Sequence, residues 1–129
     1  MYQSFIAPSC PELERFESGA FDPAQFRHCD HVRVAFEMLG HYPFAEAASR
    51  FSRGLRAMTL RAGKPEAYHE TITIAFLSLI AEARDSSPSD FEVFAQHNPD
   101  LFDKRALLEV YSQARLESPI ARRTFVLPR

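Results

Sequence analysis

The sequence has few of the features that mark secreted or membrane proteins. It holds only two cysteines, Cys10 and Cys29, without a CxxC spacing, so neither a disulfide framework nor a zinc ribbon is expected. Its longest apolar run, residues 72–81, contains Thr73 and Ser78 and is about half of the roughly 20 residues that a bilayer requires. The N-terminus lacks a basic segment followed by an apolar core, which argues against a secretory signal. These absences predict a reduced, cytoplasmic protein without a membrane partner.

The charge balance argues against one further class of partner. Seventeen acidic and fifteen basic residues give a formal net charge of −2, and such a charge creates no field that attracts a polyphosphate. Nucleic-acid binding is therefore not expected. The remaining composition is 46% hydrophobic, with twelve phenylalanines among 129 residues, and is typical of one globular domain with its own core.

Helical periodicity recurs along the chain, whereas no alternating apolar and polar run of strand length occurs. Positions 28, 31, 32, 35 and 39 have helical spacing and precede Gly40, and a second apolar stripe runs from Phe44 to Gly63. A third helix is expected from about Pro65 to Arg84, and it is apolar nearly all round.

Two shorter helices complete the prediction. One is expected over residues 89–96, and the last follows Asp103, which is a suitable N-cap. Prolines and Gly19 punctuate the first twenty residues and favour an irregular arm there. The sequence therefore predicts an all-α, single-domain bundle of four to five helices, with an irregular arm over 1–20 and a tail over 119–129.

Three histidines are the main functional lead, because helical spacing directs all of them inwards. His28 and His31 share a face of the first helix, and His69 lies one turn into the central helix with mostly apolar neighbours one and two turns later. Three imidazoles on two packed helices are a ligand set for Zn²⁺, Cu or Fe with an open coordination position. The spacing is neither HExxH nor the carboxylate-rich pattern of di-iron bundles. We therefore expect a metal-binding protein or a small enzyme whose pocket these histidines line.

The same cluster is compatible with two other roles. In a metal-free enzyme, one histidine is a general base that Glu70 or Asp30 orients, while Tyr68 and Thr71 bind a small-molecule substrate. Glu70 and Tyr68 are the predicted catalytic residues. Alternatively, the histidines cap helices or satisfy buried carbonyls, and the chain is a non-catalytic interaction module that forms a homodimer through an apolar patch. The residues expected in that patch are Phe91, Phe94, Leu101 and Phe102.

Three stretches resemble a group of small bacterial proteins of unknown function. They read FRHCDHVRVAFEML, YHETITIAFLSLI and YSQARLESPIARRTFVLP, and they cover about a third of the chain. The resemblance implies a shared helical fold and a shared pocket, with no reaction attached. The matching positions are His28, His31, Tyr68, His69, Glu70, Thr71, Tyr111, Ser112, Ser118, Pro119, Ala121 and Arg122.

Overall fold

The computed structural model describes residues 10–86 and 90–129. Within these ranges the chain is all-α, with seven α-helices, four short 3₁₀ helices and no strand. Five of the α-helices have seven or more residues. The predicted all-α fold is confirmed. No helix in these ranges is long and apolar enough to cross a bilayer.

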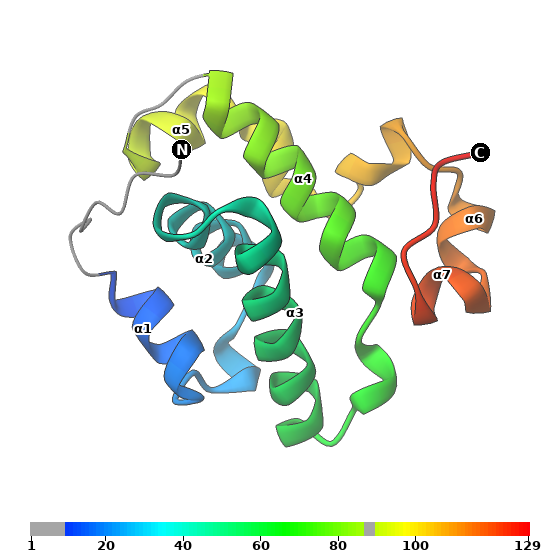
Figure 1. Cartoon of the computed structure of the whole chain (residues 1–129), viewed down its shortest axis with the longest axis horizontal. Helices are drawn as coiled ribbons and strands as arrows, with labels where there is room; N and C mark the ends of the chain where they lie inside the picture. The colour runs from blue at the N-terminus through cyan, green and yellow to red at the C-terminus, as the bar shows by residue number, and fades with distance from the viewer. Residues whose placement is uncertain (1–9, 87–89) are drawn as a thin grey trace.

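Three helices form the centre of the molecule. They are α2 (His28–His41), α3 (Phe44–Arg61) and α4 (Glu70–Ser86), and each packs against the other two (Figure 1). Helix α2 is buried on more than one side, because the side chains of Val32, Val34 and Met38 are wholly inaccessible to solvent. Leu77 and Ile80 of α4 are equally buried. The predicted stripe of α2 therefore covers only part of the surface that this helix buries.

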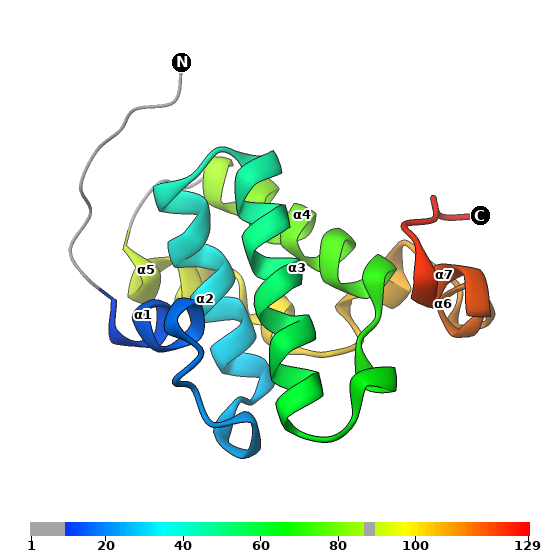
Figure 2. The ribbon, with the colours of Figure 1, turned by 60° about the horizontal axis from the view of Figure 1, so that its bottom comes forward.

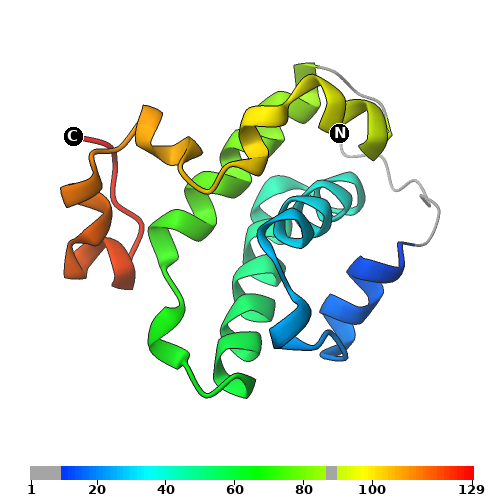
Figure 3. The ribbon, with the colours of Figure 1, turned by 180° about the vertical axis from the view of Figure 1, so that it is seen from behind.

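Shorter elements surround this centre. Helix α1 (Pro11–Ser18) packs on α2 and α3, and α5 (Phe91–His97) packs on α2. After α5 the chain returns along α4 through η3 (Pro99–Phe102) and η4 (Ala106–Glu109), as the rear view shows (Figure 3). Helices α6 (Gln113–Glu117) and α7 (Pro119–Arg123) then lie beyond the N-terminal end of α4 (Figure 2).

The prediction of an irregular arm over residues 1–20 is wrong for the part of that range that the structure describes. Residues 11–18 form α1, and residues 1–9 of that prediction lie outside the described ranges. Pro11 occupies the first turn, and Gly19 ends the helix in the left-handed region at φ 80°. Proline at the start and glycine just after the end are helix signals, so the two residues that suggested irregular chain are the boundaries of a helix.

Helix α1 approaches α3 so closely that one position of α3 has to be glycine. A Cβ atom on Gly54 would lie 2.3 Å from ring carbons of Phe16. The Phe16 ring is held in place because it also stacks on Phe26 and packs against Phe51, with ring centroids 5.6 and 5.7 Å away. Gly54 is therefore a packing glycine in the middle of a helix.

Two of the predicted helices are interrupted. The segment from Pro65 starts with a single 3₁₀ turn, η2 (Pro65–Ala67), and the chain is extended at Tyr68 before α4 begins. Asp103 does not cap a long helix, because its carboxylate binds the backbone N–H and guanidinium of Arg105. Ser112 and Ser118 instead cap two short helices, α6 and α7, so the predicted tail over 119–129 begins with a helical turn.

The apolar patch expected for a homodimer is also wrong. Phe94 is fully buried and Leu101 is 9% exposed. Phe91 and Phe102 are partly buried and pack against the core. The rings of Phe91 and Phe94 also contact Phe36 of α2, with centroids 5.4 and 4.7 Å apart. These residues attach α5 and η3 to the bundle and do not form an exposed patch.

Candidate ligand-binding site

A cavity of about 900 Å³ lies between α2, α3 and the first half of α4. All three predicted histidines line it, and most of the other wall residues are apolar. Ligand sites commonly have volumes of about 300–1,000 Å³ and mainly apolar walls with a few polar groups. The apolar part of the wall consists of Phe26, Phe51, Leu55, Ala67, Ile72, Phe76 and Ile80.

His28 lies at one end of the cavity, in the first turn of α2. The chain starts this helix there because the Asp30 carboxylate accepts the backbone N–H of Arg27 at 2.9 Å. Asp30 therefore caps the helix and does not orient a histidine. The Nε2–H of His28 donates to the carbonyl oxygen of Leu101 at 3.1 Å, and its ring meets Phe76 edge-on. His28 thus joins α2 to η3 and keeps one ring face towards the cavity.

His31 lies one turn later and is the histidine that faces the cavity without a protein partner. Its ring packs on Phe26, with centroids 4.4 Å apart, and lies 6.1 Å from the ring of His28. No residue in the described ranges makes a hydrogen bond to this ring. Desolvation lowers the pKa of His31 to about 4, with smaller effects from His28 and Lys104, which lower it, and from Asp30, which raises it. The imidazole is therefore neutral at pH 7.

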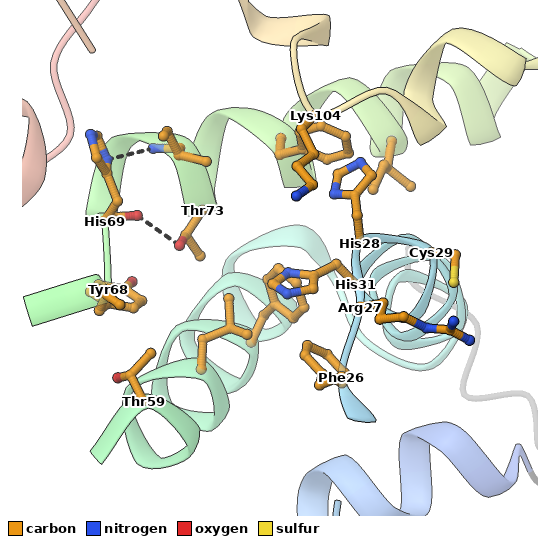
Figure 4. A pocket seen from close by; sticks show the side chains of 16 residues that line it. Phe26, Arg27, His28, Cys29, His31, Thr59, Tyr68, His69, Thr73 and Lys104 are labelled. Carbon is orange, nitrogen blue, oxygen red and sulfur yellow. Dashed lines mark hydrogen bonds between the residues drawn. The ribbon is translucent and has the colours of Figure 1, made fainter. Parts of the chain in front are cut away.

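His69 has a different environment, because both of its ring nitrogens are occupied. Its Nδ1 accepts the backbone N–H of Ile72 at 3.1 Å, which makes His69 the N-cap of α4. Its Nε2–H donates to the carbonyl oxygen of Leu116 in α6 at 2.6 Å. Figure 4 shows the His69 ring at the far end of the cavity from His28 and His31, turned away from both. His69 is buried and connects α4 to residues 111–129, which we call the C-terminal segment.

This arrangement does not suit the predicted three-histidine metal centre. A metal ligand needs an unprotonated ring nitrogen, and the only such nitrogen of His69 accepts the Ile72 N–H. Over residues 10–86 and 90–129, no group of three or more histidine, cysteine or acidic side chains is placed to hold an ion. Binding by His69 would require α4 to lose its cap.

Tyr68 and Glu70, the predicted catalytic pair, interact with each other. The Tyr68 hydroxyl donates to Glu70 Oε1 at 2.6 Å, and Arg56 contacts the same oxygen at 3.3 Å. Burial and this bond raise the pKa of Tyr68, so its hydroxyl remains protonated at neutral pH. Tyr68 lines the cavity, whereas Glu70 does not. The ring of Tyr68 is therefore part of the wall, and its hydroxyl is already engaged.

Thr71, expected to bind substrate, holds the C-terminal segment instead. It is fully buried, and its hydroxyl donates to the carbonyl of Thr124 at 2.7 Å and accepts the N–H of Val126 at 3.0 Å. The Tyr111 hydroxyl donates to the carbonyl of Val126 at 2.7 Å. These bonds hold residues 124–126 in an extended conformation against the start of α4.

Other polar positions of the resemblance cap helices of the C-terminal segment or bind it to the residues before α4. Ser112 and Ser118 accept backbone N–H groups at the starts of α6 and α7. The Arg122 guanidinium donates to the carbonyls of Glu66 and Tyr68 at 2.8 and 3.3 Å. Among the polar motif residues, His28 and His31 lie at the cavity, whereas His69, Thr71 and Arg122 join the C-terminal segment to the start of α4 or to the residues just before it.

The cavity also contains residues that the sequence did not single out. Lys104 lies in the turn between η3 and η4, and Figure 4 shows its side chain reaching over His28. Thr59 and Phe26 complete the opposite side. Lys104 and Thr59 lie outside the stretches of the resemblance, and only the return of the chain after α5 brings Lys104 to α2.

Comparisons with known proteins leave the site without a precedent. No protein family, curated protein or solved structure matches the chain.

Proposed function

We propose that this protein binds a small organic molecule in the cavity between α2, α3 and α4. The observation that carries the proposal is the His31 ring, which faces a largely apolar cavity and has no hydrogen-bond partner in the part of the chain that the structure describes. His31 is partly buried, and its ring nitrogens are not among the fully buried side-chain atoms that lack a partner. A polar group of a ligand can therefore replace water at this ring while the apolar wall buries the rest of the molecule.

The state of His31 favours binding over proton transfer. A general base is most effective when its pKa is near the operating pH, and the pKa of His31 is about 4. Neutral imidazole offers one donor and one acceptor. His31 is therefore suited to orient a polar group of the ligand, while the surrounding phenylalanine, leucine and isoleucine side chains bury its apolar body.

The metal-dependent version of the sequence hypothesis remains a prediction. It requires His69 to release the Ile72 N–H and to turn towards His28 and His31. The metal-free version needs no such change.

Fluorescence titration with the neutral apolar dye Nile red tests the proposal. Ile72 lines the cavity and is 39% exposed, so Ile72→Trp fills the entrance without disturbing the core. Leu108 is 42% exposed and does not line the cavity, so Leu108→Trp is the matched control. We expect Ile72→Trp to weaken dye binding by about tenfold, equivalent to about 1.4 kcal/mol, and Leu108→Trp to leave it unchanged. A wild-type protein that does not bind the dye, or two variants that bind it equally, would overturn the proposal.

A further inference from the structure

We infer that the ligand of this cavity is an apolar molecule with one carboxylate, and that Lys104 binds that carboxylate. The inference rests on the proposed function, because it assigns a chemical class to the ligand of the same site. It is carried by the distribution of charge around the cavity.

The charges on the cavity wall have one sign. Among its lining residues in the described ranges, Arg27 and Lys104 are cationic and none is Asp or Glu. A cationic ligand would therefore have no counter-charge on the wall, whereas an anion would have one. Figure 4 shows the Arg27 side chain pointing outwards and the Lys104 ammonium close to the His28 ring. Lys104 is thus the cation that reaches the cavity.

Lys104 is also available to bind an anion. The adjacent carboxylate, Asp103, is bound by Arg105 through both of its oxygens, at 3.2 and 3.1 Å. Over residues 10–86 and 90–129, no acidic side chain forms an ion pair with Lys104. Lys104 and Asp30 both lie near enough to His31 to shift its pKa, in opposite directions, and the Asp30 carboxylate is bound to the backbone N–H of Arg27. One ammonium at the rim and a neutral imidazole below it form a polar end to an otherwise apolar cavity.

This polarity predicts how the ligand lies. The apolar body contacts Phe51, Leu55 and Ile72 between α3 and α4, and the carboxylate lies between Lys104 and the histidines of α2. A single ammonium balances a single negative charge, so a carboxylate fits better than a dianionic phosphate ester. Phosphate recognition more often uses the paired donors of arginine.

Displacement of Nile red by three ten-carbon compounds tests the inference. Decanoate, decanol and decylamine share one apolar body and differ in charge, and each is used below its micelle concentration or, for decanol, below its solubility limit. We expect decanoate to displace the dye at about one-fifth of the decanol concentration, as one partly exposed ion pair allows, and decylamine to be the weakest. Decanol and decanoate of equal potency would overturn the inference and leave the cavity as a neutral binding site. A chain that binds neither the dye nor any of the three would instead refute the proposed function.

Lysine variants assign the effect to one residue. Lys104→Met keeps the length of the side chain and removes its charge, so it should make decanoate and decanol equal. Lys104→Arg should retain the preference for decanoate. Lys64 does not line the cavity, and Lys64→Met is the matched control that should behave as the wild type. A preference for decanoate that survives Lys104→Met would show that another group binds the anion.

Discussion

Replacement of His69 by alanine should destabilise the fold by about 2–4 kcal/mol. The N-cap bond to the Ile72 N–H contributes about 1 kcal/mol, as N-caps typically do. Loss of the Nε2–H donor leaves the buried carbonyl of Leu116 without its partner, which costs about 1–3 kcal/mol. A domain of this kind is stable by about 5–15 kcal/mol, so the variant still folds and its free energy of unfolding is measurable.

Urea denaturation at pH 7.5, followed by circular dichroism, measures the loss. His69→Asn separates the two bonds, because asparagine is a strong N-cap but is too short to replace the bond to Leu116. It should recover about 1 kcal/mol relative to alanine. His97→Ala, at an exposed position, should change stability by less than about 0.5 kcal/mol.

Two results would refute this reasoning. If the free energy of unfolding of both His69 variants lay within about 0.5 kcal/mol of the wild-type value, the histidine would neither cap α4 nor stabilise the attachment of α6. If EDTA destabilised the wild type as much as His69→Ala does, the ring would be a metal ligand. We expect EDTA to change nothing.

Three further predictions concern stability. The pKa of His31 is lowered from 6.5 to about 4 in the folded chain, so between these pH values only the unfolded state binds a proton at this residue. The free energy of unfolding should therefore decrease by about 3 kcal/mol as the pH falls from 6.5 to 4. Urea denaturation of His31→Gln over this pH range should lack this decrease. Gly54→Ala should destabilise by about 1 kcal/mol, since overpacking against Phe16 exceeds the gain in helix propensity, and Phe16→Leu in the same chain should reduce that effect. Thr71→Val should cost about 1–3 kcal/mol and accelerate hydrogen exchange at the Val126 amide, whereas Thr59→Val should not.

The boundaries of α3 could be predicted because local signals determine them. Pro43 precedes α3, and Gly63 follows its end, as the sequence indicates. Helix α1 was missed because eight residues provide too few turns for a clear apolar period, and its flanking Pro11 and Gly19 were interpreted as breakers. Both outcomes depend on residues adjacent in the sequence.

The candidate site was predictable only in part. Helical spacing correctly brought His28, His31 and His69 to one cavity. Helical spacing did not predict how the rings are oriented or what they bind, because the partner of His69 is a carbonyl 47 residues away in the sequence. The prediction that Thr71 binds a substrate failed for the same reason, because its hydrogen-bond partners lie far along the sequence, at residues 124 and 126. The role of a polar side chain depends on contacts that neighbouring residues do not determine.

The C-terminal segment is held against the start of α4 mostly through its main chain. His69 and Thr71 bind the carbonyls of Leu116 and Thr124 and the amide of Val126, so none of these bonds depends on the side chains of those three positions. Many substitutions at 116, 124 and 126 therefore keep the attachment, apart from any apolar packing that they lose. Proline at 126 is the exception, because it lacks the amide that Thr71 accepts. Homologues with this attachment could differ widely in those three residues and still retain a buried hydroxyl at the position of Thr71.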